Sequence, residues 1–581
     1  MAQDFTATFT RVDAPHAAAQ GGVRCGAWLV SLEAGDATVV TRPGSELRAV
    51  IKGCVYGAGP DALLDAYERH GPDFPRHLEG NYAALLLDGR AGRILAITDR
   101  VGSRALYAAH DGLHAALSTR ADWAPLRKRP LSLAGVSSML IKGNLIGGLT
   151  LHEGVTSLRR ACVHELAVDT FRAHDYWPLT FTPDAGRSEA DLEAEFVHLL
   201  RAAVTRRLAA SGDRPYLSLS GGYDSRALLS LMSAPGRAVR TVSYTLSTLT
   251  PGSDAPIAQR LAAQYGAQHT ALTAYRGRVL DNVQQNVSWS GGAAPLCDEA
   301  DAWAEFAALN PSDVFVGDHA FDFNSHPLGG RADQLLRQKV PPSYELLGWL
   351  RGSLSSDTFG ALESQWHATL DGVLAHSGAA PGQTFDGYEL EMALMLDVNV
   401  AHSLLPWRDR FAGHTAQVHT PYLDGALLDF TLGLPLPLLA RKALFRRALR
   451  RLDPQLMQVP LARSLGYVAD WKLELIAQRD DIWDSVQATP SPLDDLISPD
   501  VIQTLLLNLA PTPRGTQWRG NLRQTLGRLR RTPLGLRVLG PAPIRKTVDA
   551  ATFLRRVLVL RELTAARLPV PTTPVRLPEP A

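Results

Sequence analysis

The stretch SLSGGYDSRALL, residues 218–229, joins a short apolar run to a helical pattern. The residues RPYLSLS predict a strand that ends near Ser220, because the run is short, apolar and bounded by turn signals. The residues DSRALLSLMS predict a helix that begins near Asp224. Gly221 and Gly222 lie between these elements, where the missing side chains allow a tight turn and a close approach of a ligand to the backbone. The stretch therefore predicts a strand–turn–helix unit with a binding site at its turn.

The turn offers many hydrogen-bond donors to a phosphate group. The first N–H groups of a helix have no partners within the helix and favour anions, and the hydroxyls of Ser218, Ser220 and Ser225 lie in the same stretch. No Gly-Lys-Ser/Thr sequence follows the glycines, so the loop is not a Walker A motif. A carboxylate at Asp224 would repel a phosphate unless a cation lay between them, so Asp224 indicates Mg²⁺. The alternative is an ordinary Gly-Gly turn whose aspartate caps the helix.

Strand-like and helical segments alternate along the chain after residue 188. SEADLEAEFVHLLRAAVTRRLAA predicts a helix capped by Ser188, RTVSYTLS a strand, APIAQRLAAQYGAQ a helix and DVFVGD a strand. This alternation is typical of a parallel sheet covered by helices. Residues 1–180 differ, because short apolar runs separated by Gly and Asp predict strands there. We therefore expect a strand-rich domain over 1–180, an α/β domain over 181–480, and a helical extension with a Pro-rich tail over 481–581.

The composition is that of an ordinary globular chain, with 45% hydrophobic residues, 20% charged residues and a net charge of +1. A charge so close to zero indicates no nucleic-acid partner, and the Arg-rich stretch near the C-terminus has little of the aromatic interleaving of a nucleic-acid site. The sequence shows no run long enough to span a membrane and no signal-peptide pattern. Four cysteines without metal-ligand spacing are typical of a reducing compartment, so we expect a cytoplasmic protein.

The loop resembles the SGGxDS pyrophosphate loop of ATP-pyrophosphatases, and further motifs narrow the resemblance to the asparagine synthetase-like family. Up to about residue 470, the motifs appear in the order typical of that family: EGNYAALLLD, ITDRVGSRALYAA, AQRLAAQYGAQH, HTPYLDGALLDFTLGLP and RKALFRRALRRLDPQLMQVPLARSLGY. The resemblance implies an α/β fold in which an N-terminal αββα glutaminase-like sandwich of the Ntn type precedes a C-terminal α/β ATP-pyrophosphatase domain (adenine nucleotide alpha hydrolase-like). Members include asparagine synthetase, β-lactam synthetase and lasso-peptide cyclases.

The resemblance implies that the chain uses ATP with Mg²⁺. In the family a carboxylate attacks the α-phosphate of ATP, pyrophosphate leaves, and a nitrogen nucleophile displaces AMP from the acyl-adenylate. Asp224 matches the family's Mg²⁺ ligand. Lys442 and Arg446 match its catalytic cations, and their spacing places both on one face of a predicted helix; the alternative is an exposed basic helix. The residues implied in ATP binding are Ser218, Ser220, Gly221, Gly222, Asp224, Ser225 and Gly317.

The first departure from the family pattern lies at the N-terminus. The family's glutaminase uses an N-terminal cysteine, whose thiol is the nucleophile and whose free amine is the base, whereas Ala2 occupies that position here. We therefore expect no release of ammonia from glutamine, and we expect free ammonia or a substrate amine as the nucleophile. Cys25 would replace the missing cysteine only if the first 24 residues were removed, and a lone cysteine is more commonly a small core residue.

Two further departures lie in the C-terminal half. In VFVGDHAFDFNSH, Phe321 occupies the usual aspartate position, so either Asp318 or Asp322 would supply the second Mg²⁺ carboxylate. In GHTAQVHTPYLD, Gln417 takes the place of the family's usual glutamate and His419 the place of its arginine. A glutamine can orient a nucleophile by hydrogen bonds, and His419 can act as a base near neutral pH.

Two functions are compatible with these residues. The first is an ATP-dependent amide-forming ligase of the asparagine synthetase type, which acts on a small-molecule or peptide carboxylate; a lasso-peptide cyclase or another specialised natural-product ligase is one form of it. The second is a catalytically degenerate homologue that binds nucleotide without turnover, which Phe321 and Gln417 favour and the intact SLSGGYDSR opposes. The family resemblance also allows a homodimer.

Overall fold

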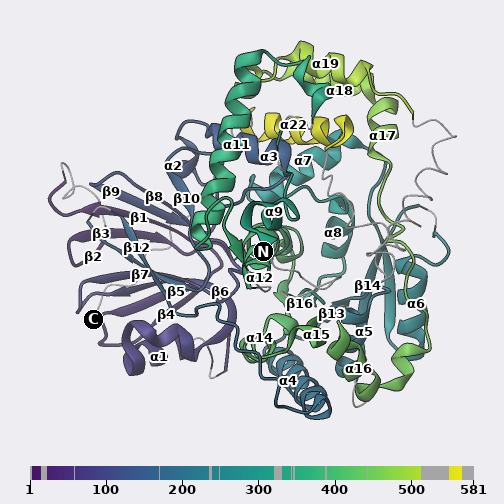
Figure 1. The fold of residues 1–581 in the computed structure, drawn as a ribbon. Coiled ribbons are helices and arrows are strands. Elements are labelled where there is room, and N and C mark those ends of the chain that lie inside the picture. Colours follow the sequence, from purple (N-terminus) through teal and green to yellow (C-terminus); the bar gives the residue numbers. More distant parts are fainter. Residues whose placement is uncertain are drawn as a thin grey trace.

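The computed structural model describes residues 3–14, 22–57, 59, 61–168, 170–233, 238–247, 249–319, 330–341, 343–344, 347–385, 389–440, 442–511 and 548–565. Ala2, Phe321, Asp322 and nearly all of the Arg-rich C-terminal stretch and Pro-rich tail lie outside these residues. The described chain forms a strand-rich sandwich, a parallel sheet flanked by helices, and a helical body (Figure 1). None of its described helices has both the length and the apolar character that crossing a membrane would require.

The described part of the N-terminal sandwich contains twelve strands: β1 (Thr6–Arg11), β2 (Val23–Cys25), β3 (Trp28–Glu33), β4 (Thr38–Thr41), β5 (Leu47–Tyr56), β6 (Glu79–Asp88), β7 (Arg93–Thr98), β8 (Tyr107–His110), β9 (His114–Ser118), β10 (Val155–Ser157), β11 (Cys162–Leu166) and β12 (Phe171–Asp175). They form two antiparallel sheets, ordered β10-β8-β9-β1-β3-β2 and β12-β11-β7-β6-β5-β4. Along β6, Leu85 faces the opposite sheet and Leu86 faces helix α1 (Ala62–His70). On the other outer face, Tyr107 packs near Leu126 of the short helix α2 (Ala124–Arg127). The predicted αββα sandwich is confirmed.

The C-terminal half is built on a parallel sheet of β13 (Pro215–Ser218), β14 (Arg240–Thr245), β15 (Gln268–Thr273), β16 (Asp313–Phe315) and β19 (Gln417–His419). Their order in space is β15-β14-β13-β16-β19, so the direction of winding reverses between β13 and β16. One face is covered by α4 (Glu189–Ala209), α5 (Tyr223–Ser233), α6 (Asp254–Gln264) and α16 (Ala443–Leu452), and the other by α8 (Ala300–Ala307). The predicted parallel α/β fold is confirmed, and Ser188 caps α4 by accepting from the Asp191 N–H.

The helical body packs around a core of its own. Its main helices are α3 (Leu133–Ile141), α7 (Val279–Ser290), α11 (Ser356–His376), α19 (Pro499–Leu507) and α22 (Ala550–Ala565). Helix α22 lies against α3, α7 and α19 (Figure 1). This core therefore joins segments from all three regions that the sequence suggested, rather than ending at residues 180 and 480.

The remaining elements connect these three parts. The helices are α9 (Ala332–Arg337), α10 (Gly348–Arg351), α12 (Glu389–Leu394), α13 (Leu405–Arg410), α14 (Gly425–Leu432), α15 (Leu436–Leu439), α17 (Trp471–Ala477) and α18 (Arg479–Ala488). A π-helical segment, η4 (Met395–Leu404), joins α12 to α13, and β17 (Gly330–Arg331) pairs with β18 (Thr384–Phe385). The short 3₁₀ segments are η2 (Gly71–His77), η5 (Ala412–His414), η6 (Pro421–Leu423), η7 (Pro454–Met457) and η8 (Pro492–Asp495).

Candidate functional site

The carboxyl ends of β13 and β16 lie side by side at the point where the strand order of the parallel sheet reverses. In open α/β sheets, ligands bind outside the carboxyl ends of the strands at such a reversal. The loop 218–222 leaves β13 here, α5 begins at Tyr223, and the segment 316–319 leaves β16 beside it. The topology therefore brings the SGGYDS loop together with Gly317 and Asp318.

Hydrogen bonds within the protein hold the loop in a fixed shape. The Ser225 hydroxyl accepts from the Ser220 N–H at 3.0 Å, the Asp254 carboxylate from the Gly221 N–H at 2.8 Å, and the Ser220 hydroxyl from the Gly222 N–H at 3.2 Å. Burial raises the pKa of Asp254, although the Gly221 N–H favours its charged form. These three loop N–H groups are therefore paired within the protein, whereas the N–H groups in the first turn of α5 are those that a helix leaves without intrahelical partners and that favour anions.

A buried arginine ties the loop to the segment that covers it. The Arg226 guanidinium donates to the carbonyl oxygen of Gly221 at 2.9 Å and to three carbonyl oxygens of the segment 456–460 at 2.5–2.8 Å. The Ala462 N–H donates to the same Gly221 oxygen at 3.4 Å. A Cβ atom added at residue 221 would lie 2.4 Å from the Cβ atom of Ala462. The covering segment thus approaches the loop so closely that only glycine fits at this position.

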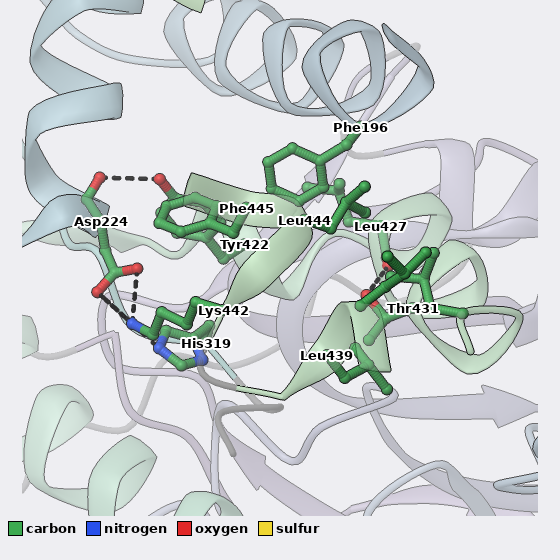
Figure 2. A pocket seen from close by; sticks show the side chains of 12 residues that line it. Phe196, Asp224, His319, Tyr422, Leu427, Thr431, Leu439, Lys442, Leu444 and Phe445 are labelled. Carbon is green, nitrogen blue, oxygen red and sulfur yellow. Dashed lines mark hydrogen bonds and ion pairs between the residues drawn. The ribbon is translucent and has the colours of Figure 1, made fainter. Parts of the chain in front are cut away.

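Asp224 and Lys442 form an ion pair at the edge of an open pocket (Figure 2). The Lys442 ammonium lies 3.0 and 2.8 Å from the two carboxylate oxygens, and the two side chains remain 20% (Lys442) and 24% (Asp224) exposed. Nε2 of His319 lies 3.9 Å from the same carboxylate. The Tyr422 hydroxyl donates to the backbone oxygen of Asp224 at 2.8 Å, which fixes the first turn of α5. The arrangement therefore presents a cation and a carboxylate, side by side, at the start of a helix.

Lys442 precedes α16 instead of belonging to it. Its backbone adopts φ 54° and ψ 40°, in the left-handed region, which costs a residue with a side chain roughly 1–2 kcal/mol. The prediction that Lys442 and Arg446 share one helical face is therefore wrong for Lys442. Arg446 does lie on α16, with its guanidinium 5.7 Å from the ring centre of Tyr223, so both cations face the start of α5. A lysine held in this strained region is a candidate functional residue.

Gly317 packs against α5, and Asp318 is held by an arginine. A Cβ atom at residue 317 would lie 3.0 Å from the Cβ atom of Asp224, so glycine lets the two segments meet. The Arg408 guanidinium donates two hydrogen bonds to the Asp318 carboxylate, at 2.6 and 3.1 Å, and both side chains are 12% exposed. Asp318 is therefore less available to a metal than Asp224. Asp322 lies outside the described residues.

A metal ion at this edge of the sheet would need ligands besides the described side chains. Within the described ranges, no group of three His, Cys, Asp or Glu side chains is placed to hold a metal ion. Mg²⁺ is commonly bound by one or two carboxylates together with phosphate oxygens and water. Asp224, at the start of α5, fits an ion of that kind bound together with a nucleotide.

Gln417 and His419 lie away from this site. Gln417 begins β19 and pairs in register with Asp313 at the start of β16, so it lies at the amino end of the sheet, opposite the SGGYDS loop. His419 is fully buried, with Nε2 2.6 Å from Oδ1 of Asp313 and Nδ1 2.8 Å from the Tyr56 hydroxyl. Burial lowers the pKa of His419, although Asp313 opposes the shift. The structure therefore does not support Gln417 as an orienting group or His419 as a base that reaches substrate.

Four residues of the site were not predicted from the sequence: Arg226, Asp254, Arg408 and Tyr422. Arg226 lies within the quoted stretch, and an arginine on a helix with a buried face must find partners. Asp254 directly precedes the predicted helix APIAQRLAAQYGAQ, and an acidic residue is a common signal at a helix start. The contacts of Arg408 with Asp318 and of Tyr422 with Asp224 span 90 and 198 residues, so local sequence carried no signal for them.

Comparisons with known proteins find two family models that match separate parts of the chain. A model of asparagine synthase matches residues 195–309, which include the SGGYDS loop and Asp254, and a model of a glutamine amidotransferase domain matches residues 46–122. No curated protein matches the chain at a significant level.

Several solved structures resemble this chain at low identity and with low TM-scores. An NMN synthetase from Francisella tularensis is 15% identical, with 23% of this chain and 56% of that chain covered and a TM-score of 0.16; the chain therefore spans little more than half of that protein. The U34-tRNA thiolase NcsA from Methanococcus maripaludis is 10% identical, with 57% and 89% covered and a TM-score of 0.21. A glutamine phosphoribosylpyrophosphate amidotransferase from B. subtilis is 10% identical, with 56% and 77% covered and a TM-score of 0.19.

The two family models carry the assignment, because their order along the chain is that of the sandwich and the parallel sheet. Residues 195–309 match the asparagine synthase model and residues 46–122 the glutamine amidotransferase model, which supports an asparagine synthetase-like family with an N-terminal glutamine amidotransferase domain.

Proposed function

We propose that this chain, an ATP-dependent amidating ligase by its family, activates a carboxylate as an acyl-adenylate and transfers the acyl group to ammonia or an amine. The observation that carries the proposal is the ion pair of Asp224 and Lys442 at the carboxyl edge of the sheet, beside the Gly221-Gly222 turn. A helix start that favours anions, a fixed cation and a carboxylate suited to Mg²⁺ are the groups that adenylation requires.

In the proposed reaction, a carboxylate oxygen bonds to the α-phosphorus of ATP, the bond to the bridging oxygen breaks, and pyrophosphate leaves. The nitrogen then bonds to the acyl carbon, AMP leaves, and the nitrogen loses a proton. Lys442 and Arg446 would stabilise the negative charge that collects on pyrophosphate, and the first turn of α5 would orient the phosphates. Mg²⁺ held by Asp224 would neutralise phosphate charge.

The cysteines support ammonia or an amine, rather than glutamine, as the nitrogen source. A glutaminase cysteine attacks as a thiolate. Burial raises the pKa of Cys25 and of Cys54 to about 11, and that of Cys162 to about 12. Burial also raises the pKa of Cys297. Each thiol is therefore protonated, and poorly nucleophilic, at neutral pH.

Cys25 is also badly placed to become a new N-terminus. It lies in β2, and its thiol donates to the carbonyl oxygens of Asp88 and Arg93 at 3.4 and 3.3 Å. Cleavage before Cys25 would remove β1, which lies between β9 and β3 and contributes the buried Phe9 to the sandwich core. The placement supports a structural role for Cys25.

Carboxylate-dependent exchange of labelled pyrophosphate into ATP tests the proposal directly. Exchange requires a reversible adenylation, so it reports the first step without the nitrogen nucleophile. We expect exchange that needs both Mg²⁺ and an added carboxylate, with acids of different length and polarity supplied in parallel. ATP binding without exchange for any acid would instead identify a nucleotide-binding homologue that does not adenylate.

Gly221→Ala should weaken ATP binding about tenfold, because overpacking of this kind costs roughly 1–3 kcal/mol. The added methyl group would meet Ala462 at 2.4 Å and would displace the loop or the segment that covers it. Titration calorimetry with ATP measures the effect. Gly222→Ala is the matched control, because a Cβ atom there meets only the Ser220 hydroxyl oxygen, at 3.3 Å. Equal weakening in both variants would contradict the close approach at Gly221.

The purified protein should release no glutamate from glutamine above the rate of a boiled sample. The physical reason is that none of the four described thiols has a pKa near neutral. An enzyme-coupled glutamate assay over several hours measures this. Glutamate release that iodoacetamide abolishes would show an active cysteine and overturn the proposed nitrogen source, while the adenylation step would remain to be judged by exchange.

A further inference from the structure

The pocket beside Lys442 changes character along its length. At one end lie the charged and polar groups of Asp224, His319 and Lys442, and at the other lie leucine side chains (Figure 2). The walls come from α4, α14, α15 and α16, with Phe196, Leu427, Leu439 and Phe445 among the lining residues. A ligand that fills this pocket would therefore carry its charge at one end and hydrocarbon at the other.

We infer that this pocket holds the hydrocarbon chain of the carboxylate substrate, so the acid that the protein activates is an apolar aliphatic one. The inference rests on the proposed function, because Lys442 marks where the phosphates and the reacting carboxylate meet. An acid whose carboxylate lies beside Lys442 would extend its chain between Leu427 and Leu439. These leucines are buried in the same core as α5 and α16, so their position is fixed by packing.

An adenine base is a poorer occupant of the apolar end. A purine has ring nitrogens and an amino group that lose hydrogen bonds to water when they are buried, and each unpaired group costs about 1–3 kcal/mol. Among the described residues that line that end, the one hydroxyl is that of Thr431, and it already donates to the Leu427 carbonyl oxygen at 2.7 Å. A methylene chain needs no hydrogen-bond partner and gains from burial. The lining thus favours an alkyl group over a nucleotide base.

The burial of an alkyl chain predicts a graded dependence on chain length. Each buried methylene contributes about 0.8 kcal/mol, which is about fourfold in affinity, until the pocket is full. The gain should then stop, because further carbons extend into solvent or clash with the walls. A polar group at the far end of the acid should remove most of the gain, because its desolvation has no compensation among leucines.

Calorimetric titration of the full chain with straight-chain monocarboxylates from butanoate to dodecanoate tests the inference without turnover. We expect the affinity to rise about fourfold per methylene and then level off, and we expect dicarboxylates of equal length to bind at least tenfold more weakly. Leu439→Phe should move the plateau to acids about two carbons shorter, and Leu439→Ala should move it to longer acids. The matched control is Leu449→Ala, because Leu449 is buried in the same core, on α16, but does not line the pocket.

Several outcomes would overturn the inference. They are an affinity that does not depend on chain length, equal binding of dicarboxylates, or a plateau that both Leu439 variants leave unchanged. Leu439 variants that weaken ATP but not the acids would assign the pocket to the nucleotide instead. The proposed function fails separately, through absence of carboxylate-dependent exchange, even where the binding profile is as expected. Conversely, exchange supported equally by dicarboxylates would leave the proposed function standing without this inference.

Discussion

Asp224→Ala should reduce carboxylate-dependent ATP–pyrophosphate exchange about a thousandfold. The carboxylate lies in the first turn of α5, where the phosphates of ATP are expected, and it is the side chain best placed to share a Mg²⁺ ion with them. A metal clamp on a transferred phosphoryl group contributes several kcal/mol to the transition state, and each 1.36 kcal/mol is tenfold in rate. The fold should survive, because alanine keeps the Cβ atom that packs against Gly317 and the backbone oxygen that accepts from Tyr422.

Asp224→Asn separates charge from shape in the same position. Its amide oxygen can still accept a hydrogen bond from Lys442. A purely structural role of residue 224 in holding Lys442 would therefore be partly preserved. We expect asparagine to lose as much exchange as alanine, because an amide binds Mg²⁺ poorly and leaves phosphate charge uncompensated. Asp429→Ala serves as the control, because this carboxylate is exposed and pairs with Arg100 at 2.9 Å. Exchange that persists in Asp224→Asn within tenfold of the unchanged protein would remove Asp224 from the metal site.

The fold was largely predictable because its signals are local. Alternation along β6 sends Leu85 into the sandwich and Leu86 toward α1, and this period of two is visible in the sequence. The glycines of the SGGYDS loop and the apolar run before them predict the turn at the end of β13. The reversal of strand order places this turn where ligands generally bind in open α/β sheets. This inference depends on the strand order of the sheet, which the sequence alone did not provide.

The predictions from sequence that failed concern residues whose conformation or contacts depend on partners far along the chain. RKALFRRALRRL reads as one continuous helix, and a lysine gives no local signal that the chain enters the left-handed region at residue 442. His419 lies in a strand, and which way it faces is decided by its register with Asp313 and by the Tyr56 hydroxyl of the sandwich. A long separation along the chain also explains why the role of Arg408 was not predicted. Arg408 lies on α13, whereas its partner Asp318 follows β16, 90 residues earlier.

Ion pairs join the N-terminal sandwich to the part of the chain that carries the site. The Lys52 ammonium lies 2.8 Å from both Asp4 and Asp409, so it joins the sandwich to α13 through the half-buried carboxylate of Asp4 and the buried carboxylate of Asp409. Arg408, the residue before Asp409, holds Asp318 beside the SGGYDS loop. Breaking a buried ion pair by removing one partner is costly. The N-terminal domain therefore helps to hold α13 and Arg408 in place, a structural role that does not depend on glutamine hydrolysis.

Lys442→Ala should reduce the rate of exchange about a hundredfold and change the apparent affinity for ATP much less. Negative charge collects on pyrophosphate as it leaves, so a cation fixed at that point stabilises the transition state more than the ground state. Loss of one such contact costs about 3 kcal/mol. The left-handed backbone at residue 442 provides an internal control, because Lys442→Gly relieves that strain. Lys442→Gly should lose as much activity as alanine while melting at no lower temperature.

Substitution of the neighbouring arginines tests whether the loss of exchange is specific to Lys442 or is shared by the whole basic surface. Arg447 binds Glu193 at 2.7 Å and Arg451 donates to the Ala190 carbonyl oxygen at 3.2 Å, so both face α4 rather than the SGGYDS loop. Arg447→Ala and Arg451→Ala should therefore keep exchange within about twofold, since neither side chain faces the loop where the phosphates are expected. A hundredfold loss at all three positions would mean that the phosphates are stabilised by the combined charge of the basic surface rather than by Lys442 in particular. A loss at Lys442 alone requires a cation held at one point, which is what its bond to Asp224 at 2.8 Å provides.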